Sequence, residues 1–250
     1  MSIDAAVHGD AGTVEPVVSL RLVDGSEVRR PLRLAQAREV VAAVPWRATR
    51  SAKGQTHFPG FYWSATTGTH VIYESRLELA RLLLADFDPD VVAIAAQPFG
   101  LKASVDGRVR RHVPDFLLVH ADGSAGVVNV KPAGRLADPE VAEALDWPRR
   151  LIEAHGWGYE VWSGDDPVYL ANVRFLAGYR RPGLLAEALL AEVLDAVRPG
   201  DCVTTLTCRM GRTRPAPAVK AAVLRLLWQR RLTTDLRCRL DGASPLRAAS

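Results

Sequence analysis

A pair of short apolar stretches around a tight turn constrains this chain more than any other feature of its sequence. The first covers 113–119 and reads Val-Pro-Asp-Phe-Leu-Leu-Val, and the second covers 127–131 and reads Val-Val-Asn-Val-Lys. Asp122-Gly123 lies between them, and an Asp-Gly pair suits the chain reversal of a β-hairpin. The two stretches are therefore predicted to be neighbouring strands of a sheet.

Three polar residues lie at the ends of these predicted strands. Asp115 opens the first strand, whereas Asn129 and Lys131 sit two apart at the end of the second and so share a face. The three side chains are expected to converge in a place suited to hold a divalent metal and a water beside a phosphate. In the alternative interpretation, Asp115 only caps a turn and Lys131 is a solvated strand end.

Predicted helices and strands surround this hairpin in an order typical of α/β proteins. A helix comes first, then a meander of strands, then a second helix and a last strand. The segments are 73–85 (helix), 91–97, 99–105, 108–119 and 126–131 (strands), 139–155 (helix) and 158–163 (strand). This order predicts an α/β sandwich around a mixed sheet.

The first predicted helix carries two acids and a base on one side. Glu74, Glu78 and Arg81 follow i, i+4, i+7 spacing, which places them on the same face. Two like charges four residues apart disfavour an isolated helix unless a cation lies near them. Arg81 is one candidate for that cation, and a bound metal ion is the other.

The first 45 residues are predicted to be an extension without an assigned role. A lead over 1–15 precedes a hairpin of 17–22 with 27–32 and a helix at 34–43. The segment 46–70 is predicted to be a loop that mixes basic and aromatic residues, which suits phosphate contact and base stacking. A packed surface segment with solvated charges is the alternative. The candidate DNA contacts in this loop are Arg47, Arg50, Lys53 and His57.

The chain changes character after Asp165-Asp166-Pro167. Helices are predicted at 184–197 and 217–231, 203–210 is a short helix or strand, and 232–240 with Asp241-Gly242 predicts a small hairpin. Three helical segments and a hairpin resemble a winged-helix unit, here over 169–250. Basic residues dominate its second half, which favours contact with DNA or with an acidic protein. The candidate DNA contacts are Arg212, Arg214 and Lys220.

Composition excludes several classes of protein. Three cysteines without a Cys-x-x-Cys pair argue against a disulfide framework or a zinc site and favour reduced, buried thiols. No apolar run reaches the roughly 18–20 residues that span a bilayer. The start of the chain lacks a basic and an apolar region like those of a signal peptide, so the cytoplasm is the expected compartment.

Several motifs together resemble the PD-(D/E)XK nuclease superfamily and, more closely, the TnsA-like endonuclease subunits of heteromeric transposases. The match covers roughly 46–165 and depends on the order of its motifs rather than on any one of them. These motifs are Ser75-Arg76-Leu77-Glu78, Gln97-Pro98-Phe99, Pro114-Asp115-Phe116 and Asn129-Val130-Lys131. The resemblance implies a restriction-endonuclease-like mixed sheet flanked by helices over 46–168.

The resemblance also implies roles for individual residues. Glu78, Asp115 and the Val130 carbonyl would bind Mg²⁺, with Mn²⁺ as a substitute, and Lys131 would be the catalytic lysine. Glu74 is a rival for the glutamate role, and Gln97 is a possible orienting residue. Asn129 stands where most of the superfamily has Asp or Glu, so weak metal affinity is expected. His112 and His120 have no metal-ligand spacing and are interpreted as structural or DNA-facing.

The function implied by this resemblance is that of a metal-dependent endodeoxyribonuclease within a transposase. Such a subunit would hydrolyse one DNA strand at each transposon end, while a DDE-type transposase subunit cuts the other. The C-terminal unit would contact DNA, that transposase or an AAA+ regulator. Two alternatives stay open: a stand-alone restriction or repair nuclease, and a DNA-binding module whose catalysis has lapsed.

Overall fold

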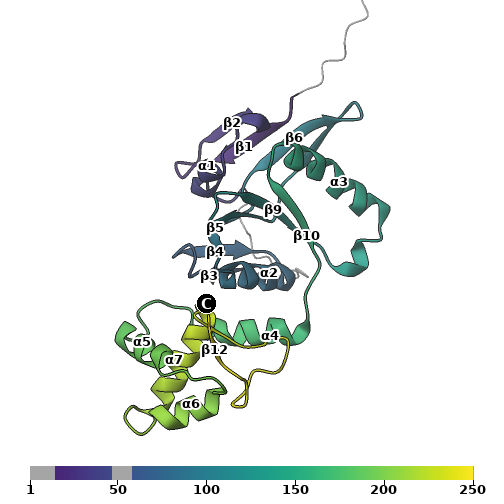
Figure 1. The fold of residues 1–250 in the computed structure, drawn as a ribbon. Helices are drawn as coiled ribbons and strands as arrows, with labels where there is room; N and C mark the ends of the chain where they lie inside the picture. The colour runs from purple at the N-terminus through teal and green to yellow at the C-terminus, as the bar shows by residue number, and fades with distance from the viewer. Residues whose placement is uncertain (1–14, 47–57, 250) are drawn as a thin grey trace, which may run out of the picture.

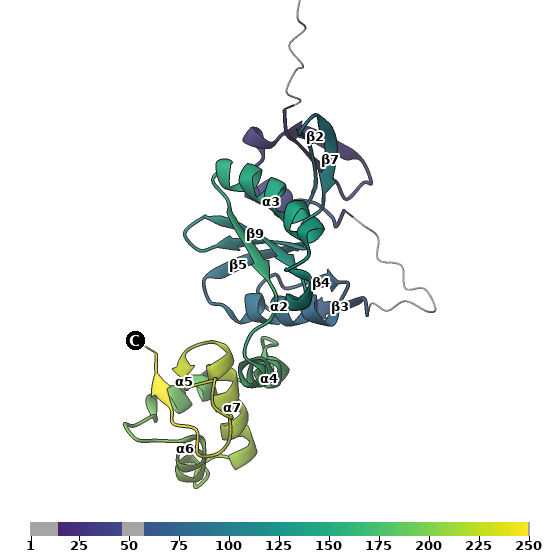
Figure 2. The same ribbon diagram turned by 90° about the vertical axis from the view of Figure 1, so that its right-hand side faces the viewer.

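The computed structural model describes residues 15–46 and 58–249 of the 250-residue chain. The candidate DNA contacts Arg47, Arg50, Lys53 and His57 lie outside the described residues. Figures 1 and 2 show the layers from one end of the molecule to the other. A first sheet forms one end, a second sheet with helices beside it forms the middle, and a group of helices forms the other end.

The central sheet has the strand order β10-β9-β8-β5. Its strands are β5 (Val91–Ala96), β8 (Phe116–His120), β9 (Ala125–Val130) and β10 (Gly158–Trp162). β8 runs antiparallel to both β5 and β9, and β10 lies parallel to β9. The helices are α2 (Arg76–Phe87) and α3 (Pro139–Ala154). The predicted order of helix, strands, helix and strand is therefore present, and the β8–β9 hairpin turns where Asp122-Gly123 predicted.

The single mixed sheet predicted from the sequence is wrong in one respect, because two further strands of the meander belong to another sheet. β6 (Gly100–Val105) and β7 (Arg108–His112) join the strand order β2-β1-β6-β7. The stretch 108–119 was predicted to be one strand, but it breaks at 113–115. Pro114 has no N–H to give to a ladder, which explains why pairing stops there.

The N-terminal segment completes this first sheet. β1 (Val17–Arg21) and β2 (Glu27–Pro31) form the predicted hairpin, and β1 also pairs with β6 through Val17 and Lys102. A short 3-10 helix η1 (Leu32–Leu34) leads into α1 (Ala37–Ala42). A hydrophobic core joins the inner face of this sheet to the central sheet and to α3. It includes Val18, Leu20, Leu101, Leu117, Val127, Trp147 and Ile152.

The loop predicted at 46–70 contains a strand, and a second strand extends past its end. β3 (Gly60–Trp63) and β4 (His70–Tyr73) form an antiparallel hairpin. The buried carboxylate of Asp86, near the end of α2, stabilises this hairpin by accepting from the hydroxyls of Tyr62 (2.6 Å) and Ser64 (2.7 Å) and from the backbone N–H of Thr66 (2.8 Å). This anchor lies about twenty residues further along the chain, which explains why local sequence predicted a loop.

Helix α2 begins later than predicted. Ser75 caps it by accepting from the Glu78 N–H at 3.1 Å, so Glu74 precedes the helix and does not share a helical face with Glu78. Arg81 is also not the cation between these acids, because its guanidinium binds Glu160 of β10 at 2.7 Å. The prediction that Glu74, Glu78 and Arg81 share one face of the helix is therefore wrong.

The C-terminal part of the chain is helical and shares a core with α2. Its helices are α4 (Pro167–Leu176), which the sequence analysis missed, the 3-10 helix η3 (Ala177–Tyr179), α5 (Glu187–Asp195), α6 (Val203–Met210) and α7 (Ala216–Trp228). Phe87 of α2 packs against Trp228 of α7 with ring centroids 5.2 Å apart. The strands β11 (Leu232–Thr233) and β12 (Arg247–Ala248) pair. The predicted hairpin at 232–240 is wrong in its second strand, which lies nearer the C-terminus.

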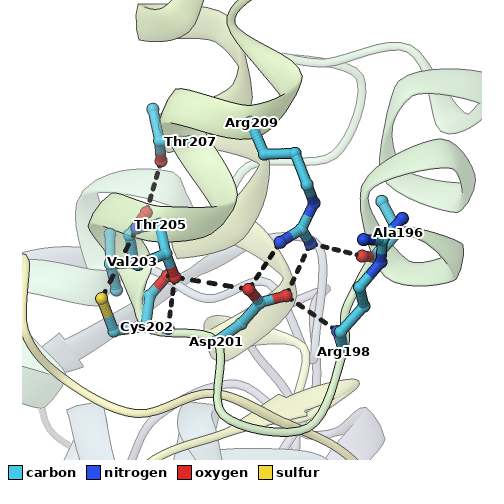
Figure 3. Close-up of polar contacts among 8 residues, drawn as sticks. All are labelled: Ala196, Arg198, Asp201, Cys202, Val203, Thr205, Thr207 and Arg209. Carbon is cyan, nitrogen blue, oxygen red and sulfur yellow. Dashed lines mark hydrogen bonds and ion pairs between the residues drawn. The ribbon is translucent and has the colours of Figure 1, made fainter.

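A buried carboxylate fixes the connection between α5 and α6 (Figure 3). Both oxygens of Asp201 accept hydrogen bonds from the Arg209 guanidinium, at 2.6 Å each, and Oδ2 also accepts from the Arg198 N–H at 2.8 Å. The Arg209 guanidinium also donates to the Ala196 carbonyl at the end of α5. Bonding to Arg209 lowers the pKa of Asp201 to about 2. Arg209 is therefore a structural residue of this unit.

The described residues contain no helix long and apolar enough to cross a membrane. The three cysteines are free thiols, and Cys208 and Cys238 are exposed, so the prediction of buried thiols is wrong.

Candidate functional site

Asp115 lies at the point where the chain enters β8 from the first sheet. Its Oδ2 accepts a hydrogen bond from the Val130 N–H at 2.6 Å, and its carbonyl accepts from the Gln97 N–H at 2.8 Å. The carboxylate is therefore held beside the backbone of Val130, whose carbonyl is the predicted metal ligand. Lys131 follows immediately, and its N–H donates to the Trp162 carbonyl of β10 at 2.9 Å. The backbone of Lys131 is thus adjacent to Val130, and the convergence of the Lys131 side chain with Asp115 stays a prediction.

Glu78 lies close enough to Asp115 for their charges to interact. Burial raises the pKa of Glu78, and the negative charges of Asp115 and Glu74 raise it further. Its two oxygens also accept hydrogen bonds, from the Glu74 N–H at 2.7 Å and from the Ser75 hydroxyl at 2.9 Å. Glu78 thus ties the two residues that precede α2 to its first turn, and it lies near a second carboxylate.

Asn129 is buried, at 2% exposed, and its amide is oriented by a histidine. The Oδ1 atom lies 2.8 Å from His112 Nε2, and the His112 ring packs edge-on against Trp147. Asn129 Nδ2 and the Tyr159 hydroxyl are both buried, and hydrogen bonding with Asn129 partly offsets the rise in the pKa of Tyr159. With Oδ1 facing His112, Asn129 offers N–H donors to its surroundings rather than a metal-binding oxygen.

Tyr159 of β10 belongs to the same region. Burial raises its pKa, and the negative charge of Asp115 raises it further, so the hydroxyl stays protonated. Sequence reasoning did not select Tyr159, and it left His112 as structural or DNA-facing. No local motif marks either residue, because both reach Asn129 from strands distant in the chain.

Gln97 holds an uncommon backbone conformation next to the site. Its φ is +45°, a left-handed value that non-glycine residues rarely adopt. Its N–H donates to the Asp115 carbonyl and its carbonyl accepts from the Trp46 N–H at 2.9 Å. Gln97 is buried, and these backbone bonds hold the turn from β5 into β6 against the start of β8. The structure therefore gives Gln97 a positioning role through its backbone.

The oxygen atoms of Glu78, Asp115 and the Val130 carbonyl are of the chemical type that binds magnesium. Glu78 and Asp115 are two carboxylates in electrostatic contact, and their mutual repulsion is relieved by a cation between them. Mg²⁺ takes oxygen ligands and usually keeps several waters, so two carboxylates and a carbonyl are enough. Within the described ranges no group of three or more His, Cys, Asp or Glu side chains could hold a metal, so Glu78 and Asp115 would be the carboxylate ligands of any ion bound here.

The candidate DNA contacts at the C-terminal end differ in their surroundings. Arg212 and Lys220 are exposed, whereas Arg214 forms an ion pair with Glu192 at 3.0 Å. Other basic residues of this stretch are also engaged within the fold, including Arg209 with Asp201 and Arg225 with the Tyr179 carbonyl. The basic excess read from the sequence is therefore partly neutralised in the folded unit.

The mixed α/β fold, with Glu78 and Asp115 close to each other beside the central sheet, fits the nuclease-like class. Residues 88–164 match the family model described as TnsA-like endonuclease N terminal. This segment is therefore similar to a TnsA-like endonuclease domain. The matched segment includes Asp115, Asn129 and Lys131, whereas Glu78 and the C-terminal helices lie outside it. A search of curated proteins finds no match.

Proposed function

We propose that this protein is a Mg²⁺-dependent endonuclease subunit of a transposase that hydrolyses one DNA strand at each transposon end. The observation that carries the proposal is the electrostatic contact of Glu78 with Asp115, whose carboxylate is held beside Val130 within a TnsA-like segment. A DDE-type transposase subunit would cut the other strand. An AAA+ regulator is a further expected partner of the C-terminal unit.

Each residue has a distinct task in this proposal. Glu78, Asp115 and the Val130 carbonyl would hold the metal, which when bound supplies charge neutralisation at the phosphate and lowers the pKa of a coordinated water. Lys131 would place a positive charge beside the developing negative charge. The Asn129 amide would donate a hydrogen bond to a phosphate oxygen or a water, which suits a site that has an amide where related nucleases have a carboxylate.

A second candidate function is a nuclease-like DNA-binding module without catalysis. The observation that favours it is Asn129, because the amide removes a negative charge from the metal site and its oxygen is taken by His112. The two candidates differ in their response to Mg²⁺. A metal site stabilises the folded protein by RT ln(1 + [L]/Kd), about 1.4 kcal/mol when the metal is at ten times its Kd, and a lapsed site gives no stabilisation.

The test is nicking of supercoiled DNA in Mg²⁺ or Mn²⁺, with wild type beside Asp115→Ala, first alone and then with the transposase encoded beside it. Metal-dependent nicking that the variant loses supports the proposal. Nicking by wild type alone would favour a stand-alone nuclease. No nicking in either setting, together with no effect of Mg²⁺ on the melting temperature, would establish the lapsed module instead.

A further inference from the structure

A basic groove crosses the outer face of the first sheet. It encloses a volume of about 700 Å³. Its charged lining contains three cations, Arg29, Lys102 and Arg111, against the single acid Glu27, which pairs with Arg29 at 2.7 Å. The groove therefore presents a net positive charge to solvent.

The strand register places two of these cations directly opposite each other. Lys102 of β6 pairs with Arg111 of β7, and both side chains are exposed. Like charges at directly opposed positions destabilise a sheet, so this pair opposes folding in the free protein. The neighbouring positions Leu101 and Ala103 point inward and are buried, which fixes Lys102 on the outer face. An anion bound between the two cations would remove their repulsion.

Two residues of the groove lining connect it to the candidate active site. His112 lines it and contacts the Asn129 amide, and Val113 lines it two residues before Asp115. Trp46 forms another part of its wall, lying against Gly100 so closely that a Cβ at Gly100 would be 2.9 Å from the ring. The Trp46 N–H in turn donates to Gln97, next to the start of β8. A polyanion lying in the groove would therefore continue towards Asp115.

We infer that this groove, lined by Arg29, Lys102 and Arg111, binds the phosphate backbone of the DNA that flanks the cleaved bond. The inference rests on the proposed function, since it names the surface that leads the substrate into the same site. Phosphates spaced along a strand match a row of cations better than an isolated anion does. Figure 2 shows β2 and β7 at the opposite end of the molecule from α5–α7, so this surface is separate from the C-terminal candidates Arg212 and Lys220.

The experiment measures binding of fluorescent duplex DNA by the metal-free full chain at several salt concentrations. Lys102→Ala/Arg111→Ala is compared with wild type and with Arg38→Ala/Arg174→Ala, which removes the same charge from exposed positions elsewhere. Losing two phosphate contacts should lower affinity on the order of 10- to 100-fold near 0.1 M salt and reduce the slope of log K against log salt by about 1.8. The control should bind within about twofold of wild type.

A charge reversal separates a binding role from a folding defect. Lys102→Glu places opposite charges at the cross-strand pair, so the free protein should melt at a slightly higher temperature while its DNA binding weakens. Equal affinity and equal salt slope for the groove variant and wild type would overturn the inference, as would a wild type that does not bind DNA. Because the assay contains no metal and measures no cleavage, this result is independent of whether the nuclease proposal holds.

Discussion

The substitution Asp201→Asn tests how strongly one buried carboxylate stabilises the C-terminal helical unit. The side chain keeps its size but loses the charge that accepts two bonds from Arg209 and one from the Arg198 N–H. The folded pKa of about 2, against an ordinary value of 3.8, corresponds to about 2 kcal/mol of stability. The Arg209 side chain is 31% exposed, and solvent screens part of this, so we expect a loss of about 1–2 kcal/mol.

The lowered pKa of Asp201 determines how the stability difference between wild type and Asp201→Asn should change with pH. The folded pKa of Asp201 is depressed, so its contribution is fully present well above pH 3.8 and is lost as the pH falls through about 2. The free energies of unfolding of wild type and variant should therefore differ by the same amount at pH 7 and pH 5, and this difference should shrink below about pH 4 and vanish below about pH 2.

Urea denaturation followed by tryptophan fluorescence measures this difference, with Asp195→Asn as the control. Asp195 is an exposed aspartate at the end of the same helix α5, so its substitution should change stability by less than about 0.5 kcal/mol. The reasoning is refuted if Asp201→Asn costs no more than the control, or if its cost is the same at pH 7 and near pH 2.

Two further substitutions separate a functional acid from a structural one. Glu78→Gln should stabilise the metal-free protein at neutral pH, because burial and the charges of Asp115 and Glu74 oppose ionisation of Glu78, while the glutamine amide oxygen still accepts from the Glu74 N–H. It should also abolish stabilisation by Mg²⁺, and melting curves with and without the metal check both effects. Asp86→Asn should instead cost about 2–4 kcal/mol, since the buried carboxylate accepts four hydrogen bonds of 3.1 Å or less from Tyr62, Ser64, Ala65 and Thr66. A chemical denaturation curve that matches wild type would contradict the role given to Asp86.

Local sequence patterns predicted β8, β9 and α3, because the residues that specify each of these elements lie within it or directly beside it. Short apolar runs and an Asp-Gly turn specify β8 and β9, and a proline-initiated amphipathic helix specifies α3. The backbone positions of Asp115 and Lys131 follow directly from that hairpin, since one residue precedes β8 and the other follows β9. Their roles in a site stay a prediction.

The rest of the fold depends on contacts between distant segments. β6 leaves the central sheet because it pairs with β1, about eighty residues earlier in the chain, and β7 follows by pairing with β6. The sequence of β6 does not indicate that partner. The β3–β4 hairpin depends on Asp86 in the same way. The orientation of Asn129 depends on His112, which comes from the other sheet. Such long-range contacts determine where a side chain faces, and a single sequence does not show them.

The most direct test of the central claim is strand-resolved cleavage of an end-labelled transposon-end duplex by the complex reconstituted with its transposase. Wild type and Asp115→Ala are compared in Mg²⁺, with equal DNA binding by both established first. The account predicts that the variant complex loses cleavage of one strand and retains cleavage of the other. Cleavage of both strands at wild-type rates by the variant complex would contradict the assignment of the nuclease site to Asp115 and its neighbours.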